Sequence, residues 1–410
     1  MELINGKYQC NGGLDPLEVG KNYGYPLYIY ESAIMKRQLD RLRDAFSVPK
    51  LKINYACKAL SNPAILKLFR SWGTGLDTVS INEVKLGLLA GFAPKDIIFT
   101  PSCIGLKEME DAIKLGVKIT IDSITLLEQL GQKYPDLPLC IRVNPHIMAG
   151  GNHKISVGHV DSKFGISFHQ MPHVYRLVEN LGVRIEGIHM HTGSDIYDAD
   201  VFLKGAEILF DIANHFPSVD FIDFGSGFKV AYKEGDICTD IESLGQQLSV
   251  RFNEFVKNYG RPLTLMFEPG KYLVSEAGTF LVETNVVKQT TASTFAGVNS
   301  GLNHLIRPML YDAYHDILNI SNPDAKKRIY NIVGYICETD TFGVNRRMDE
   351  IREGNILAFR NAGAYCFSMA SNYNSRTRPA EVLIHKGKAH LIRKGESFDD
   401  LLENVVEVEL

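Results

Sequence analysis

The sequence lacks the cysteine pattern of a secreted or zinc-binding protein. Its seven cysteines are odd in number, scattered along the chain and never arranged as C-x-x-C. Disulfide frameworks and zinc knuckles depend on closely spaced cysteines, so this distribution disfavours both. We therefore expect a protein of the reducing cytoplasm.

The chain also lacks the long apolar runs and charge blocks that mark other classes of protein. Residues 1–13, MELINGKYQCNGG, do not join a basic stretch to an apolar one, and no apolar run approaches the length of a membrane span. The net charge is −4, and charges of both signs are interspersed. We therefore expect a globular protein whose partners are neither nucleic acids nor membranes.

Short apolar runs alternate with amphipathic segments from about residue 50 to residue 270. Most runs are followed by a helical period, and eight such repeats predict an α/β fold with a closed (β/α)8 TIM barrel. An open doubly wound sheet is the alternative, but no G-x-G-x-x-G follows the first run. The runs are LKINYACK (51–58), GTGLDTVS (73–80), DIIFTP (96–101), KITIDS (118–123), PLCIRVNP (138–145), RIEGIHMHTG (184–193), VDFIDFGSG (219–227) and PLTLMFEPG (262–270).

Beyond residue 270 the pattern changes to alternating strands that are joined by Gly- and Asn-rich turns. This pattern predicts a C-terminal antiparallel β domain, resembling a barrel or a sandwich. The first 27 residues show little helical period and are expected to add a strand to that domain. The predicted domains are therefore a barrel of residues 28–270 and a β domain of residues 271–410, with residues 1–27 contributing a strand.

Polar side chains gather where the predicted strands end. Lys58 follows the first run, and Ser61-Asn62-Pro63 then opens a helix. Burial can lower the pKa of such a lysine enough to make it a nucleophile, although a solvated lysine is the simpler interpretation. Barrel enzymes keep their chemistry at the carboxyl ends of the strands. The other candidates at these ends are Asp77, Asp122, Arg142, Asn144, His189, His191, Gly225–Gly227 and Glu268–Lys271.

Two motifs at the strand ends indicate a ligand. FGSGF (224–228) and EPGK (268–271) place glycines at adjacent exits, where backbone N–H groups can approach a phosphate, although tight turns would use the same residues. HMH (189–191) could bind a metal, but no third strand-end histidine is present. Stacking of one imidazole on a flat ligand is the preferred interpretation.

The predicted β domain carries three further candidates. Arg307 and Tyr311 are four residues apart, so on a helical turn they could hold a carboxylate together, or form a surface contact. Cys337 and Glu338 place a thiol beside a carboxylate, although a free cysteine is more often a core residue. The long turn-rich stretch 363–381 could be a surface loop or could carry function.

Taken together, the motifs resemble those of the fold-type III pyridoxal-phosphate decarboxylases. The order YACKA, HMHTGS, FGSGF, EPGK, RPMLYDAYH, CET and GAYCFSMASNYNSRTRPAEVL matches that family over nearly the whole chain. It is most similar to the branch that converts meso-2,6-diaminopimelate to L-lysine and CO2 in lysine biosynthesis. The resemblance implies the same barrel and β domain, pyridoxal 5'-phosphate (PLP) as cofactor, and no metal.

The resemblance also implies roles for the strand-end residues. Lys58 would hold PLP as a Schiff base, His191 would stack on the ring, and Glu268 would pair with the pyridine nitrogen. A carboxylate there keeps the nitrogen protonated, which favours decarboxylation over racemisation. The remaining residues assigned to the cofactor site are Asp77, Arg142, Ser194, Gly225, Ser226, Gly227, Pro269, Gly270, Lys271 and Tyr365.

For the substrate, the resemblance implies that Arg307, Tyr311 and Lys271 hold the far carboxylate. Glu338 would hold the far amine, with Tyr365 nearby. Cys337 would return the proton, which makes Lys58, Cys337, His191 and Glu268 the catalytic set. The family is usually homodimeric with its sites at the interface, so the resemblance implies that Cys337 and Glu338 would act in the partner subunit's site.

The sequence departs from the family pattern at three positions. Lys271 stands where EPGR has arginine, Asp195 follows Ser194 where glutamine is usual, and Ser226 replaces the middle glycine of a GGG turn. Rival functions are a decarboxylase of the same fold that acts on ornithine, lysine or carboxynorspermidine, and a relative that binds the cofactor without turnover. A rival of another class is a metal-dependent barrel hydrolase built on His189 and His191.

Overall fold

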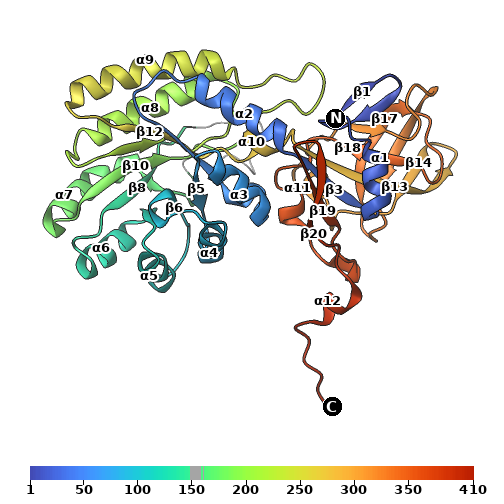
Figure 1. Ribbon diagram of the computed structural model, residues 1–410. Coiled ribbons are helices and arrows are strands. Elements are labelled where there is room, and N and C mark those ends of the chain that lie inside the picture. The colour runs from blue at the N-terminus through green and yellow to red at the C-terminus, as the bar shows by residue number, and fades with distance from the viewer. Residues whose placement is uncertain (148–157, 160) are drawn as a thin grey trace. The chain divides into compact units, whose positions relative to one another are not determined.

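The computed structural model describes residues 1–147, 158–159 and 161–410 (Figure 1). The chain divides into two compact units. The barrel unit comprises Gln38–Val230 and Ile237–Leu273, and the β unit comprises Met1–Arg37, Ala231–Asp236 and Val274–Leu410. These ranges differ at their edges from the predicted domains, because the segment that follows residue 27 and a short stretch after Val230 belong to the β unit.

Among the described residues, eight parallel strands close the barrel unit into a (β/α)8 barrel, as the sequence predicts. Closure comes from β12, which pairs with β4 in parallel, and from the pairing of β10 with β8. A short ninth strand, β9 (Ile166–Ser167), pairs in parallel with the carboxyl end of β8. The eight strands are β4 (Leu51–Ala56), β5 (Gly75–Thr78), β6 (Ile97–Phe99), β7 (Lys118–Ile121), β8 (Leu139–Asn144), β10 (Ile185–Met190), β11 (Phe221–Asp223) and β12 (Thr264–Phe267).

The barrel strands could be predicted from the sequence because both of their faces are buried. Every residue of β5, β6, β8, β10 and β11 is buried, and most of these strands are rich in apolar residues. Helices surround the strands (Figure 1). They are α3 (Pro63–Ser71), α4 (Ile81–Leu89), α5 (Leu106–Lys114), α6 (Ile124–Lys133), α7 (Met171–Leu181), α8 (Ala199–Ala213) and α9 (Ile241–Tyr259), with α2 (Ser32–Asp44) and α10 (Lys271–Val274) at the two ends of the barrel segment.

The helix predicted after Lys58 is confirmed. The side chain of Asn62 accepts a hydrogen bond from the N–H of Ala64, and Pro63 occupies the first turn of α3. An Asn cap followed by Pro satisfies the free N–H groups of a helix start and stops the strand before it. The chain therefore leaves β4 at Ala56 and makes a 3-10 turn over Cys57–Ala59 before α3 begins.

The β unit is built on a sheet in the order β17-β16-β14-β13-β3-β19-β20, and β18 pairs with β13 and β15. The pairs β14–β16 and β3–β19 are parallel, so the sheet is mixed where the sequence pattern indicated antiparallel pairing. Long connections bring these strands together in the same direction, and alternation of residues does not report direction. The strands are β3 (Leu27–Glu31), β13 (Gly278–Gln289), β14 (Thr294–Val298), β15 (Ile317–Asn319), β16 (Lys327–Val333), β17 (Thr341–Asp349), β18 (Ile356–Phe359), β19 (Ala380–His385) and β20 (Lys388–Arg393).

Smaller elements complete the β unit, and its core lies under the central strands. Leu27, Leu281 and Val382, from three neighbouring strands, are fully buried in one cluster.

All seven cysteines of the chain are free thiols. No helix within the described ranges is both long and apolar enough to span a bilayer. The smaller elements are β1 (Glu2–Ile4), β2 (Lys7–Gln9), α1 (Pro16–Tyr23), α11 (Arg307–Tyr311) and α12 (Phe398–Leu402).

Candidate active site

The carboxyl ends of the barrel strands bring the predicted lysine next to a buried acid. Lys58 lies in the 3-10 turn after β4, and its Nζ is 3.9 Å from Oδ2 of Asp77 on β5. The Lys58 side chain is 41% exposed, whereas that of Asp77 is 2% exposed. Burial, and then the charge of Glu268, raise the pKa of Asp77 well above its usual value. The amine is therefore accessible and has an acid beside it that can carry a proton.

A second group of buried ionisable side chains lies at the ends of β10, β11 and β12. Nε2 of His189 is 3.0 Å from Oε2 of Glu268, and one side-chain atom each from His189, Asp223 and Glu268 lie within 4.8 Å of one another. Burial raises the pKa of Glu268, but its interactions with His189 and Lys58 outweigh burial, so the net pKa is lowered. Burial and the charge of Glu268 raise the pKa of Asp223 well above normal. The arrangement thus favours an ionised Glu268 beside a protonated Asp223.

Residues 225–227 of the FGSGF stretch form a tight turn, and its first and third residues must be glycine. Gly225 has φ +60° and Gly227 has φ +109°. A Cβ on Gly225 would lie 2.6 Å from the carbonyl oxygen of Met190, and one on Gly227 would lie 2.2 Å from that of Gly193. The Gly225 N–H also donates to Oδ1 of Asp223 at 2.8 Å. The turn is thereby held against the segment after β10, with its backbone closely packed.

The two imidazoles of HMH have different partners. His189 lies in β10, but the strand ends at Met190, so His191 lies beyond it. Nδ1 of His191 accepts a hydrogen bond from the N–H of Ser226 at 3.3 Å. Burial and the charge of Lys58 lower the pKa of His191 well below its usual value, so this ring is neutral and its orientation is fixed by the glycine turn.

Two of the positions that depart from the family pattern contact each other. Nζ of Lys271 donates to Oδ1 of Asp195 at 2.8 Å, and the Lys271 side chain is only 9% exposed. Asp195 has φ +61°, a backbone conformation that aspartate tolerates better than most residues, and it follows Ser194 directly. The carboxylate of Asp195 is therefore balanced by the charge of Lys271 within the same chain.

Arg142 adds a positive charge to the same rim. It lies on β8 and is 7% exposed, and its guanidinium lies 4.8 Å from the centre of the Phe164 ring. Burial lowers the pKa of Arg142, while the charges of Glu268, Asp122 and Asp77 oppose that shift. Arg142 thus belongs to one electrostatic group at the strand ends, together with Asp77, Asp122 and Glu268.

In the β unit, Arg307 is buried among neutral groups. It begins α11 and is 3% exposed. Its Nε donates to the Tyr311 hydroxyl at 3.2 Å, and its Nη1 is 3.1 Å from Nε2 of His315. Its guanidinium also lies 4.9 Å from the centre of the Tyr232 ring. Among the described residues no ion pair involves Arg307, which suits it to an anionic ligand.

A second cluster in the β unit surrounds Cys337 and Glu338. The Nδ2 group of Asn374 donates to Sγ of Cys337 at 3.4 Å, and the Tyr373 hydroxyl donates to Oε1 of Glu338. The hydrogen bond from Tyr373 lowers the pKa of Glu338 and raises that of Tyr373 to about 12. Tyr365, in the same turn-rich stretch as Tyr373, has φ +58° and is partly buried.

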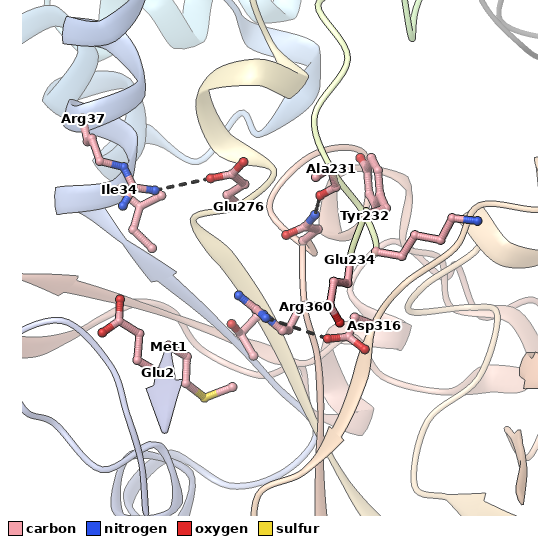
Figure 2. Close-up of a pocket in the computed structure, with 13 residues that line it drawn as sticks. Met1, Glu2, Ile34, Arg37, Ala231, Tyr232, Glu234, Glu276, Asp316 and Arg360 are labelled. Atoms are coloured by element: carbon pink, nitrogen blue, oxygen red, sulfur yellow. Dashed lines mark hydrogen bonds and ion pairs between the residues drawn. The ribbon is translucent and has the colours of Figure 1, made fainter. Parts of the chain in front are cut away.

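The β unit also contains a hollow of about 520 Å³ (Figure 2). Two ion pairs border it, Arg37 with Glu276 at 3.3 Å and Arg360 with Asp316 at 3.8 Å. None of the site residues predicted from the sequence lines it. The hollow does border Tyr232, whose ring packs against the guanidinium of Arg307.

The structure identifies contact residues that sequence reasoning did not assign. His315 stands in the same RPMLYDAYH motif as Arg307, and Tyr373 and Asn374 lie in the turn-rich stretch 363–381. Asp223 ends a predicted barrel strand, so its position alone could have marked it. The sequence marked Asp195 only as a residue that differs from the family pattern. Its contact with Lys271 could not be predicted, because the two residues are 76 positions apart in the sequence.

Comparisons with known proteins agree with this geometry. Residues 32–275 match the model of the family described as "Pyridoxal-dependent decarboxylase, pyridoxal binding domain". A diaminopimelate decarboxylase of Methanothermobacter thermautotrophicus is 38% identical over 403 residues, covering 95% of this chain and 94% of that protein. One of Aquifex aeolicus is 32% identical over 97% of this chain and 95% of its own length.

The fold comparison gives the same result. The crystal structure of diaminopimelate decarboxylase from M. jannaschii in co-complex with L-lysine superposes with a TM-score of 0.90 at 28% identity, covering 99% of this chain and 98% of the other. The family match covers more than half of the sequence, and the 38% identical relative is matched along nearly all of it. The chain therefore belongs to the pyridoxal-dependent decarboxylase family.

Proposed function

We propose that this protein uses PLP to decarboxylate meso-2,6-diaminopimelate to L-lysine and CO2. The curated relatives and the solved structure described above are named diaminopimelate decarboxylases, and the match runs along nearly the whole chain. The observation that carries the choice of substrate is the buried Arg307, which has neutral partners and no acidic one among the described residues. Ornithine and lysine have no second carboxylate for such a group to bind.

The barrel residues fit the cofactor. Oε1 of Glu268 is a buried acceptor without a hydrogen-bond partner among the described residues, which suits a protonated pyridine nitrogen. Gly225 and Gly227 form a turn that no larger residue could replace without a clash, which suits the phosphate. His191 is neutral, held by the Ser226 N–H, and suits stacking on the ring. When bound through Lys58, PLP supplies an electron sink for the carbanion that forms as CO2 leaves.

The chain's own residues then have separable roles. Glu268 would keep the ring nitrogen protonated, because its pKa is lowered while the pKa values of Asp77 and Asp223 are raised. The phosphate would be held by Ser194, Ser226, Pro269, Gly270, Lys271 and Tyr365. Arg142 would add positive charge to the rim.

At the far end of the substrate, Arg307 and Tyr311 bind the carboxylate and Glu338 binds the amine. The thiol of Cys337 donates a proton to the carbon that has lost CO2, so the product gains one C–H bond. We propose that Cys337 and Glu338 act in the site of a partner subunit of a homodimer. In this scheme residues 28–270 form the PLP-binding barrel, and residues 271–410, with the strand from residues 1–27, form the β domain.

Substrate turnover tests this proposal directly. We expect the purified protein to release CO2 and L-lysine from meso-diaminopimelate. Its kcat/KM for this substrate should be at least about 100-fold above that for ornithine, lysine or carboxynorspermidine. These three lack the far carboxylate, and losing a hydrogen bond to a charged group lowers kcat/KM by about that factor. Lys58→Ala should abolish turnover and the visible absorbance of bound PLP. A protein that prefers ornithine, or that turns over meso-diaminopimelate without Lys58, would contradict the proposal.

A further inference from the structure

We propose that His315 is a positioning residue for Arg307, holding the guanidinium by a hydrogen bond that leaves its charge available to the substrate's far carboxylate. This inference rests on the proposed function and adds a residue that the substrate does not touch. All of the groups that carry it belong to the β unit. Arg307 and His315 are eight residues apart, at the two ends of RPMLYDAYH.

The direction of this hydrogen bond follows from the other nitrogen of the ring. Nδ1 of His315 is 2.9 Å from the carbonyl oxygen of Arg360. A carbonyl oxygen can only accept, so Nδ1 carries the hydrogen and Nε2 keeps its lone pair. Nε2 is 3.1 Å from Nη1 of Arg307, which can only donate. The backbone of Arg360 therefore sets His315 as an acceptor for the guanidinium.

The imidazole stays neutral in this position. His315 is fully buried, and burial followed by the charges of Arg307 and Arg346 lowers its pKa to about 3. A second positive charge at this distance from Arg307 would repel it, and a carboxylate would cancel its charge. A neutral acceptor is the one type of group that orients a buried guanidinium and leaves its full charge for a ligand.

Two further neighbours of Arg307 are also neutral. The Tyr311 hydroxyl accepts from Nε, and the Tyr232 ring lies against the guanidinium and meets the His315 ring edge-on, with 5.8 Å between the ring centres. The Tyr232 hydroxyl is 2.9 Å from that of Ser275, so the ring is itself held in place. Burying a charge without a counter-charge is costly, and a bound carboxylate would remove that cost.

Two substitutions separate positioning from packing. His315→Phe keeps a ring against Tyr232 but removes the acceptor, and His315→Gln keeps an acceptor without the ring. We expect His315→Phe to raise KM for meso-diaminopimelate roughly 10- to 100-fold, the usual worth of a hydrogen bond to a charged group, with kcat changed less than about threefold. His315→Gln should recover at least half of that loss on a logarithmic scale.

A matched control is another buried histidine of the β unit. His304 is 1% exposed, and its ring nitrogens contact Ser300 and the Thr377 carbonyl rather than Arg307. His304→Phe should lower the melting temperature as much as His315→Phe does, but should leave KM within about twofold. Equal effects of the two variants on KM would overturn the positioning role, because they would show a general loss of packing.

Product-like inhibitors give a readout that does not depend on turnover of the variant. L-lysine keeps the far carboxylate and the far amine of the substrate, and cadaverine keeps only the amine. Binding of each to the holoenzyme, measured by calorimetry, should weaken at least tenfold for L-lysine in His315→Phe and less than twofold for cadaverine. Equal weakening of both would contradict the inference. Wild-type protein without turnover of meso-diaminopimelate would instead defeat the proposed function.

Discussion

At the residue scale, the pKa values of three buried acids at the barrel rim, Asp77, Asp223 and Glu268, are shifted in different directions. Burial and the charge of Glu268 raise the pKa values of Asp77 and Asp223, whereas the pKa of Glu268 is lowered. His189, whose Nε2 lies 3.0 Å from Oε2 of Glu268, lowers the pKa of Glu268 most, and the charges of Lys58 and Arg142 lower it further. One anion is thus fixed at the position expected for the pyridine nitrogen.

The first prediction tests that anion. Glu268→Gln keeps the shape of the side chain but removes its charge, so we expect kcat to fall roughly 100- to 1,000-fold while bound PLP is retained. Asp223→Asn keeps a hydrogen-bond donor in place of the acid proton, so its fall in kcat should be at least tenfold smaller than that of Glu268→Gln. Steady-state kinetics and the visible absorbance of the cofactor measure both effects. A greater loss in Asp223→Asn would mean that Asp223, rather than Glu268, carries the charge.

The second prediction concerns the ion pair between Lys271 and Asp195. Because the pair is largely buried, removing either partner should leave an uncompensated charge. We expect Lys271→Met and Asp195→Asn to destabilise the protein singly and the double variant to recover about 1–2 kcal/mol, measured by urea unfolding as a double-mutant cycle. Additive effects would show that the two positions act independently.

At the scale of the elements, the connections after β10 and β11 depend on close backbone packing. Gly225 has φ +60°, and a Cβ there would lie 2.6 Å from a carbonyl oxygen. Gly260 ends α9 with φ +81°, and a Cβ there would have no atom within 4 Å. The two glycines therefore share a backbone conformation but differ in the space around them.

The third prediction uses this pair as test and control. Gly260→Ala should cost about 1 kcal/mol of folding free energy through backbone strain, with no change in PLP affinity. Gly225→Ala should cost at least twice as much and should weaken PLP binding at least about tenfold, because the turn must move to admit the methyl group. Urea unfolding of the apoprotein and titration with PLP measure the two quantities. Normal PLP affinity in Gly225→Ala would argue that the turn does not contact the phosphate.

The sequence allowed the elements of the barrel to be predicted better than those of the β unit. Buried parallel strands are continuous apolar runs, so all eight were recognisable, and Asn62 with Pro63 marked the start of α3. Alternating strands show which residues share a face but not which strand pairs with which. The parallel pairing of β3 with β19 joins residues that are far apart in the chain, and no local pattern reports it.

The same limit applied to the site. Positions at strand ends follow from the barrel, so Lys58, His191 and Glu268 could be grouped from sequence alone. The contacts that orient them could not, because the bonds from Ser226 to His191 and from Lys271 to Asp195 depend on how separate loops pack. His315 lies in the same motif as Arg307, so the sequence could have marked it as a candidate. Only its contact with the Arg360 carbonyl shows which ring nitrogen accepts the hydrogen bond from Arg307.

At the scale of the whole molecule, the proposed homodimer leads to the fourth prediction. If Cys337 serves the partner subunit's site, a heterodimer of Lys58→Ala and Cys337→Ala chains contains one intact site. Random mixing of the two inactive variants should then restore about a quarter of wild-type activity, as expected for a symmetric dimer. Cys337→Ala alone should keep its PLP absorbance. No recovery after unfolding, mixing and refolding would indicate that each site is contained in one chain.

The covalent attachment of PLP to Lys58 is the claim on which the other roles depend. Borohydride treatment of the purified protein, followed by proteolysis and peptide mass spectrometry, tests it most directly. We predict a single phosphopyridoxyl group on the peptide that contains Lys58, with loss of the visible absorbance on reduction. A phosphopyridoxyl group on any other lysine, or none in protein that decarboxylates its substrate, would contradict the account.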